Sequence, residues 1–228
     1  MIDHCPVCGG RDIRFRKILW DDLIAQWRLA PHEAEYVARQ QGAHCASCGC
    51  NLRSMALAVA IMRCYAYAGT FTSFIEFPDV RGLKVLELNE AGELTRLLAR
   101  LPNRTLARYP EIDMTRLPYE DASWDLVVHS DTLEHVPQPI RGLAECRRVL
   151  RSHGFCVFTV PMIVGRLTIS RAGMEPSYHG SADALQPDYV VQTEYGADAW
   201  THVIQAGFSE CRIVSLDYPA AQAMVCVV

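Results

Sequence analysis

The second part of the chain alternates between the hydrophobic periods of strands and helices. Apolar runs of strand length occur at 84–88, 124–129 and 154–160, and residues 138–150 place their apolar side chains on one helical face. Strands alternating with helices predict a doubly wound α/β sheet, with ligands bound beyond the carboxyl ends of its strands. The full pattern predicts strands at 84–88, 104–109, 124–129, 154–160, 209–216 and 223–228, and helices at 91–101, 138–150 and 196–206.

The apolar segment 55–75 carries a single charged residue, Arg63. In a membrane span this arginine would lie near the bilayer centre, at a cost of about 2.5–3.5 kcal/mol, and the span would have to run through Gly69. A helix packed between two domains avoids both problems, so we expect no membrane association. The N-terminus is polar and bears cysteine, unlike a signal peptide, and a cytoplasmic location is expected.

Two pairs of cysteines stand out among the ten in the sequence. Each pair is a Cys-x-x-Cys turn followed by glycine, which lets two thiolates face one ion. Two such turns complete a tetrahedral sulfur site that suits Zn²⁺. A thioredoxin-like redox turn occurs singly, and disulfides are uncommon in a cytosolic chain. The sequence therefore predicts a structural zinc site, with Cys50, His4 and His44 as possible substitute ligands for Cys5, Cys8, Cys45 and Cys48.

Charge weighs against nucleic acid as a partner. The chain has a formal net charge of −4, and residues 1–68 hold only eight Lys and Arg against six Asp and Glu. Four thiolates with one Zn²⁺ would remove that small excess. No basic stripe is present to neutralise phosphates. We expect a small-molecule substrate, while the sequence leaves the oligomeric state open.

Residues 111–161 resemble the central stretch of class I S-adenosylmethionine-dependent methyltransferases. The similarity lies in "EIDMTRLPYEDASWDLVVHSDTLEHVPQPIRGLAECRRVLRSHGFCVFTVP", which has the family's LP-Y-x-D-x-S-W-D-L-V run, its EHV-x-x-P turn and its RVL helix end. The resemblance implies a Rossmann-like sheet of the seven-stranded type and S-adenosylmethionine as methyl donor. Residues 1–68 are expected to form a helical zinc-binding subdomain with four cysteine ligands, and residues 69–228 the methyltransferase domain; the segment 5–54 resembles zinc-binding segments that precede some bacterial methyltransferase domains.

The family's glycine-rich donor loop corresponds here to "ELNEAG", with one glycine. Gly92 matches the last glycine of the family pattern. Asn89 stands at the first, and asparagine tolerates a positive φ better than other non-glycine residues. By the resemblance, Glu87 orients the donor's amine through water. The alternative is that this loop has lost its ligand.

The stretch 102–123 is too short for the strand, helix and strand that the family places there. No plain acidic residue ends the strand near 104–109, so Tyr109 and Glu111 are the nearest matches for the ribose contact. Asp113 and Met114 match the family's adenine clamp, in which a carboxylate accepts from the adenine amine. Ser130 follows the strand 124–129 and completes the candidate cofactor residues, which are Glu87, Asn89, Gly92, Glu111, Asp113, Met114 and Ser130.

Methyl transfer from a sulfonium is an in-line displacement with a neutral leaving group, so alignment and water exclusion matter most. A general base is needed only for a hydroxyl or ammonium acceptor. His135 is one candidate, and the alternative for it is a capping role in its turn. Residues 162–195 are an insertion at the acceptor side, expected to fold as a lid that presents Tyr178 and His179. His179 alternatively lies on a loop surface.

Two other functional classes are alternatives. A nicotinamide-dependent oxidoreductase can use a similar sheet, but its glycine fingerprint is absent. A non-catalytic module, in which the zinc segment and a ligand-free sheet form a docking surface, is the main alternative. Binding of S-adenosylmethionine or S-adenosylhomocysteine separates it from an enzyme.

Overall fold

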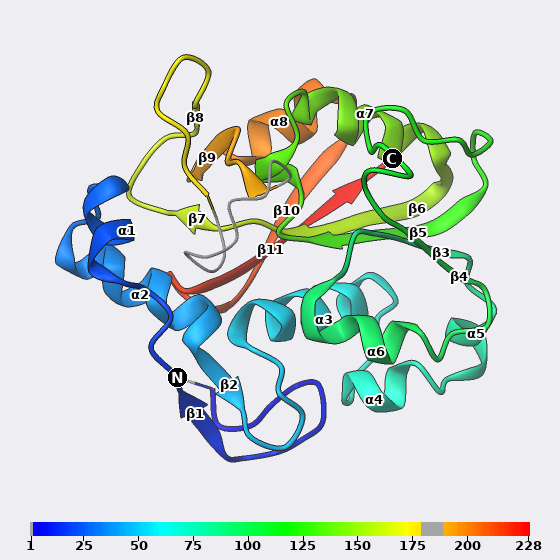
Figure 1. Cartoon of the computed structure of the whole chain (residues 1–228). Helices are drawn as coiled ribbons and strands as arrows, with labels where there is room; N and C mark the ends of the chain where they lie inside the picture. The colour runs from blue at the N-terminus through cyan, green and yellow to red at the C-terminus, as the bar shows by residue number, and fades with distance from the viewer. Residues whose placement is uncertain (1, 179–188) are drawn as a thin grey trace.

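The central element of the protein is a six-stranded sheet, seen in a computed structural model that describes residues 2–178 and 189–228. Its strand order is β10-β11-β6-β5-β3-β4 (Figure 1). The four strands β3 to β6 run parallel, whereas β11 is antiparallel to both β6 and β10. The bounds are β3 (Val85–Leu88), β4 (Arg104–Ala107), β5 (Trp124–Ser130), β6 (Leu150–Thr159), β10 (Glu210–Asp217) and β11 (Ala221–Val227). The doubly wound α/β prediction is confirmed.

The described residues contribute six strands to this sheet, where the seven-stranded type was expected. The difference lies between β4 and β5, where residues 108–123 form turns and no helix. A further parallel strand needs a crossover of about a dozen residues or more, usually containing a helix. This chain passes directly from β4 to β5 instead, and β4 forms the edge of the sheet.

Helices cover both faces of the sheet (Figure 1). α7 (Pro139–Val149) and α8 (Trp200–Gln205) lie on one face, and α3 (Leu52–Cys64) and α6 (Thr95–Leu98) lie on the other. Successive side chains of β5 point to opposite faces of the sheet and pack against the helices on each face. Leu126 and Val128 belong to the core that includes α3, while Val127 belongs to the core that includes α7.

The N-terminal segment joins the core on the α3 side. β1 (Ile13–Phe15) pairs with β2 (Ala43–Cys45), and between them lie α1 (Asp21–Gln26) and α2 (Pro31–Gly42). One hydrophobic cluster runs from Cys5 and Val7 through α3 to Phe71 and Leu94. The proposed domain boundary at residue 68 is thus not marked by a break in the core, because α3 packs directly on β11, β10 and β6.

Two predicted helices take shorter forms. The segment 91–101 forms a 3-10 turn, η1 (Gly92–Leu94), followed by the one-turn helix α6. The apolar segment 55–75 is divided between α3 and α4 (Phe71–Phe74), with the interruption around Gly69, and α5 (Pro78–Arg81) follows. Among the described residues, no helix combines the length and apolarity that a membrane span requires.

The insertion 162–195 contains a small sheet of its own. β7 (Met162–Ile163), β9 (Thr193–Gly196) and β8 (Ile169–Ser170) pair in that order. The N-terminal segment holds this insertion through several polar contacts. Among them, Trp27 Nε1 donates to Ser177 Oγ over 2.8 Å, and the guanidinium of Arg166 binds Glu33. His179 lies outside the described residues.

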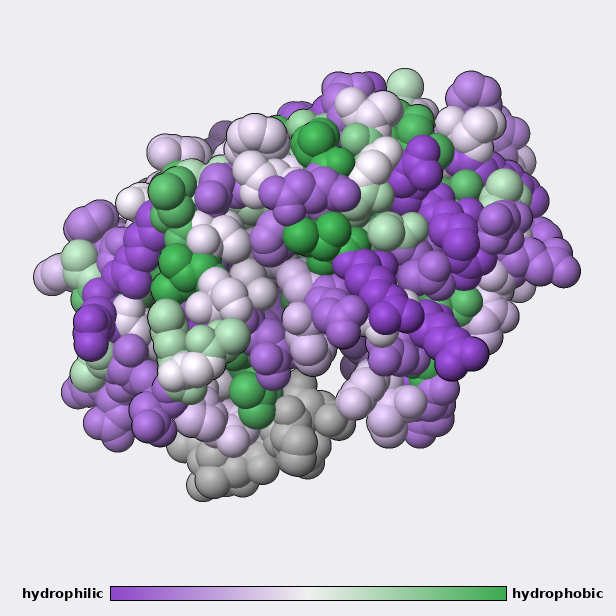
Figure 2. Space-filling model, turned by 90° about the horizontal axis from the view of Figure 1, so that it is seen from above, coloured by the Kyte–Doolittle hydropathy of each residue, from purple (hydrophilic) through white to green (hydrophobic). Residues whose placement is uncertain are grey.

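Figure 2 shows the molecule from above, the side of Figure 1 on which α7 and α8 lie. Hydrophobic side chains lie singly or in small groups between hydrophilic ones. On α8, Trp200 and Ile204 are each somewhat less than half exposed. Such scattered apolar exposure is ordinary for a soluble-protein surface.

Candidate functional site

The loop after β3 has the backbone that a ligand-binding turn needs. Asn89 adopts φ +55° and Gly92 φ +56°, so the expectation that asparagine replaces a glycine here is met in the backbone. The Asn89 amide donates to Ala107 O over 2.7 Å, which ties the turn to the end of β4. Ala91 is fully buried. The loop is thus an ordered turn, although it has lost most of its glycines.

Glu87, at the centre of β3, is fully buried, and its carboxylate is occupied by groups of the protein itself. One oxygen accepts from the Ala91 amide over 2.9 Å and from Thr95 Oγ1 over 2.6 Å. The other lies 2.7 Å from Arg104 Nε and 2.5 Å from its Nη2. In this arrangement Glu87 braces the donor loop against β4, a role that differs from the expected contact with the donor's amine.

The side chain of Asn89 connects the ends of three strands. Its Oδ1 accepts from the Tyr109 amide over 2.9 Å, beyond β4, and its Nδ2 lies 3.5 Å from Thr132 Oγ1, beyond β5. Asn89, Tyr109 and Thr132 therefore meet at the carboxyl edge of the sheet. This is the edge where open α/β sheets bind their ligands.

The segment after β4 places two of the expected adenine contacts. Asp113 is exposed, and its Oδ1 accepts from both the amide and the hydroxyl of Thr115, at 2.7 and 2.8 Å. This turn fixes the direction of the carboxylate and leaves its second oxygen without a hydrogen bond to a described residue. Met114 is buried, with its side chain against Gly142 of α7. Glu111, the expected ribose contact, is exposed.

Ser130 and His135 occupy the edge after β5. The hydroxyl of Ser130 lies 2.8 Å from Thr159 Oγ1 and is buried, so it links β5 to β6. His135, in the 3-10 turn η2 (Leu133–His135), lies 3.1 Å from Val190 O through Nδ1. Tyr178 forms a backbone bridge to the same Val190. Two of the three candidate catalytic residues thus meet at one residue of the insertion.

A buried polar cluster beside these residues was not anticipated from the sequence. His129 is fully buried on β5 and stacks on Phe158, with ring centroids 4.7 Å apart. Within the described chain, neither of its ring nitrogens has a hydrogen-bond partner. Glu134 and Tyr195 are also almost fully buried. Burial lowers the pKa of His129 to about 4, against the opposing charge of Glu134.

The depressed pKa of His129 predicts acid sensitivity of the fold. Between pH 6.5 and about 4 the unfolded chain binds a proton that the folded chain excludes, so stability present above pH 6.5 is lost as pH falls. The loss amounts to about 3 kcal/mol at 1.36 kcal/mol per pKa unit. His129→Phe, which keeps a ring against Phe158, should remove most of this dependence in urea unfolding at pH 7 and pH 4.5. The exposed His153→Gln serves as control; equal pH dependence in wild type and His129→Phe would contradict the assignment.

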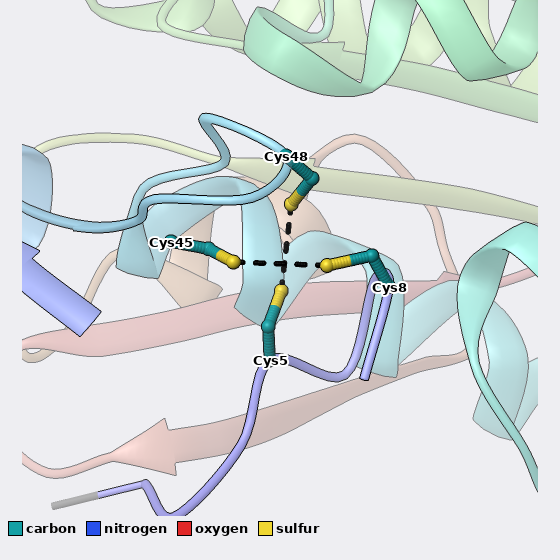
Figure 3. Close-up of side chains that lie close together, drawn as sticks. All are labelled: Cys5, Cys8, Cys45 and Cys48. Atoms are coloured by element: carbon teal, nitrogen blue, oxygen red, sulfur yellow. Dashed lines mark hydrogen bonds between the residues drawn. The ribbon is translucent and has the colours of Figure 1, made fainter. Parts of the chain in front are cut away.

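The four cysteines of the two turns come together as expected (Figure 3). Their Sγ atoms all lie within 4.8 Å of one another, and the pairs Cys5–Cys48 and Cys8–Cys45 are each 3.6 Å apart. A tetrahedral zinc with Zn–S bonds near 2.3 Å requires sulfur–sulfur distances of about 3.8 Å. The geometry and the donor set both fit that ion.

The two turns have the same backbone design. In the first, the Gly9 amide donates to Cys5 O at 2.8 Å; in the second, Gly49 donates to Cys45 O at the same distance. Gly9 and Gly49 have φ of +78° and +76°, which explains why glycine follows each pair. Burial opposes ionisation of Cys45, but amide hydrogen bonds within its turn outweigh it and lower the pKa to about 7. Among the described residues, Cys50 and His44 are not part of the four-sulfur cluster.

The second cysteine turn lies directly against the donor loop. A Cβ on Gly49 would be 3.6 Å from Glu93 and 3.8 Å from Arg96, both just beyond the loop. In the first turn of α3, Ser54 Oγ lies 3.0 Å from the position that a Cβ on Gly92 would take. The cysteine site is therefore part of the support of the carboxyl edge.

A hollow of about 450 Å³ lies at the opposite edge of the sheet. Its lining includes Lys84, Asn103 and Trp124, which stand at the amino ends of β3, β4 and β5. Ligands of parallel sheets bind at the carboxyl ends. We therefore place the candidate site by strand direction, at Asn89, Asp113 and Asp131, and not at this hollow.

Comparison with protein families shows what the segment around this edge is similar to. Residues 78–158 match the family described as "Methyltransferase domain". This segment is similar to a methyltransferase domain. The match begins at α5 and ends within β6, so it contains the loop after β3 and the carboxyl end of β5.

Curated relatives carry the same designation. A probable S-adenosylmethionine-dependent methyltransferase of Mycobacterium tuberculosis is 36% identical over 116 residues, covering 48% of this chain and 38% of that protein. A similarly named protein of Mycolicibacterium smegmatis is 38% identical over 69 residues, covering 28% of this chain and 26% of that protein. The chain thus spans well under half the length of these relatives.

Two solved structures are similar at low sequence identity. The trans-methyltransferase CalH, in complex with SAH, is 14% identical with a TM-score of 0.44, covering 90% of this chain and 62% of that one. A methyltransferase of Thermotoga maritima described as a possible histamine N-methyltransferase is 14% identical with a TM-score of 0.42, covering 77% and 89%. At this distance they indicate nothing about acceptor or site residues.

Proposed function

We propose that this protein transfers the methyl group of S-adenosylmethionine to a small-molecule acceptor. The observation that carries the proposal is the methyltransferase-domain match over residues 78–158, which contains the ordered turn at Asn89 and the ends of β3 to β5. When bound, the donor supplies an electrophilic methyl group and a neutral leaving group. The protein's contribution is then alignment of the reactants and exclusion of water.

The residues at the carboxyl edge are proposed to bind different parts of the donor. Asn89 and Gly92 shape the turn beneath the donor, and Asp113 is proposed to accept from the adenine amine with Met114 beside it. Glu111 is the proposed ribose contact. Ser130 supports the edge from β5 through its contact with Thr159.

The acceptor is proposed to bind beneath the insertion 162–195. His135 and Tyr178 both contact the backbone of Val190, which supports a shared role for them at that side. His135 Nε2 also lies 3.8 Å from Glu134, so a carboxylate is near enough to stabilise the charge that a base acquires. His179 is proposed as a third member of this group. A hydroxyl or ammonium acceptor would need such a base.

Cys5, Cys8, Cys45 and Cys48 are proposed to bind one structural Zn²⁺. Four thiolates leave no open coordination position for a substrate, which is typical of structural sites. We propose a cytoplasmic enzyme with no nucleic-acid or membrane partner, consistent with a net charge of −4. The alternative is a non-catalytic interaction module, and the engagement of Glu87 by Arg104 is the observation that favours it.

The donor assignment is tested by isothermal titration calorimetry with S-adenosylhomocysteine. Asp113→Ala should weaken binding by about 1–3 kcal/mol, because the adenine amine loses its acceptor. Asp121→Ala is the matched control, since that carboxylate is exposed and pairs with Arg148 away from the edge. Absence of binding by the wild-type protein would favour the non-catalytic module, whereas wild-type affinity in Asp113→Ala would place the adenine elsewhere.

A further inference from the structure

A buried arginine from the N-terminal segment lies at the carboxyl edge of the sheet. Arg53 is the second residue of α3, whose N-cap residue Asn51 accepts through Oδ1 from the Ser54 amide over 2.8 Å. The Arg53 side chain is 3% exposed, and its Nη1 lies 2.6 Å from Asp131 Oδ1. The Asp131 side chain is 38% exposed. The guanidinium thus lies beneath a carboxylate that faces solvent.

The guanidinium of Arg53 has unused capacity. An arginine side chain carries five N–H donors in a planar fork. In the described part of the chain, Nε and Nη2 of Arg53 have no hydrogen-bond partner. The ion pair to Asp131 involves only Nη1. A buried charge with open donors is costly unless an anion completes it. A carboxylate fits two adjacent donors of this fork.

The position of the pair matches the amino-acid end of the donor. Asp131 follows Ser130 at the end of β5 and adopts φ +50°, so the strand conformation ends there. Ser54, next to Arg53, touches Gly92 at the end of the donor loop. The Arg53–Asp131 pair therefore lies between the two loops that are expected to hold the amino-acid portion, near the positively polarised start of α3.

The usual candidate for the donor's ammonium group is already engaged. Glu87 is fully buried and accepts from Arg104, Thr95 and the Ala91 amide. Asp131, at this edge, keeps solvent exposure and already faces the Arg53 guanidinium. A zwitterionic amino acid needs one cationic and one anionic contact side by side, and Arg53 with Asp131 provides them.

We propose that the Arg53–Asp131 pair binds the α-amino-acid end of the nucleoside donor. The guanidinium takes the carboxylate and Asp131 takes the ammonium group. This inference rests on the proposed function, and it makes the donor site a composite of the N-terminal segment and the methyltransferase domain.

Two ligands that differ only in the amino-acid portion test the proposal. S-adenosylhomocysteine has the α-amino acid, and 5′-methylthioadenosine lacks it while keeping the adenine, ribose and thioether. Calorimetric dissociation constants are measured for both ligands with wild type, Arg53→Gln and Asp131→Asn. In each variant the constant for S-adenosylhomocysteine should rise about tenfold or more, while that for 5′-methylthioadenosine should change less than about twofold. Arg63→Gln, on the exposed end of α3, should change neither.

Retained binding of 5′-methylthioadenosine also shows that each variant has folded. Should Arg53→Gln fail to fold, Asp131→Asn decides alone, because its partly exposed side chain makes it the milder change. Equal weakening of both ligands would assign the pair a purely structural role and overturn the proposal. Unchanged discrimination between the ligands would overturn it as well. If wild type binds neither ligand, the proposed function falls together with this inference, a result distinct from the other two.

Discussion

Glu87→Gln is expected to destabilise the fold by about 3–5 kcal/mol, the usual cost of breaking a buried ion pair. The substitution keeps the shape of the side chain but removes the charge that compensates Arg104, whose side chain is only 14% exposed. It also weakens the acceptor for the Ala91 amide and the Thr95 hydroxyl, which hold the donor loop. Urea unfolding monitored by circular dichroism measures the effect.

A surface pair on the same loop provides the control. Glu90 and Arg108 lie 2.7 Å apart with both side chains 57% exposed, so Glu90→Gln should cost less than about 1 kcal/mol. Replacing both members of the buried pair, as Glu87→Leu with Arg104→Met, should recover much of the loss, because no uncompensated charge remains. A cost for Glu87→Gln no larger than that for Glu90→Gln would show that the buried pair does not brace the loop.

Cys45→Ser is expected to abolish zinc binding and to destabilise α3 as well as the two cysteine turns. The fully buried Cys5, Cys45 and Cys50 share a hydrophobic cluster with α3 and with Leu94 beyond the donor loop. Because metal binding is coupled to folding, losing one thiolate should cost several kcal/mol of stability. Metal analysis should fall from about one zinc per chain to near zero, and amide exchange should accelerate from residue 5 into α3.

Cys64→Ser is the matched control for the metal. Cys64 is the last residue of α3, outside the four-sulfur cluster, and its sulfur donates to Ala60 O over 3.2 Å, a bond that serine can retain. Zinc content and exchange should stay close to wild type. Metal-free wild-type protein with undiminished stability would contradict a structural zinc.

The sequence predicted the features that depend on local pattern. The alternation of strands and helices set the sheet, the Cys-x-x-Cys-Gly repeats identified the four-sulfur cluster, and Asn89 was recognised as a residue that tolerates positive φ. The shortness of 102–123 correctly indicated that no helix follows β4. Each of these features is encoded within a few neighbouring residues.

Features that depend on contacts between distant segments could not be read in this way. The partner of Glu87 is Arg104 on the neighbouring strand, and the partner of Arg53 is Asp131, more than seventy positions away. The apolar run around Arg53 and the strand pattern around His129 give no signal of a buried charge or an unpaired ring. Pairings across the sheet edge follow from tertiary packing, which a single sequence specifies only indirectly.

The central claim is that the carboxyl edge of the sheet binds the methyl donor, and a crystal structure with S-adenosylhomocysteine tests it most directly. The account predicts the nucleoside across the ends of β3 and β5, with its adenine amine within hydrogen-bonding distance of Asp113 and its amino-acid end at Arg53 and Asp131. Ligand bound at the opposite edge of the sheet, near Lys84 and Trp124, would contradict the account.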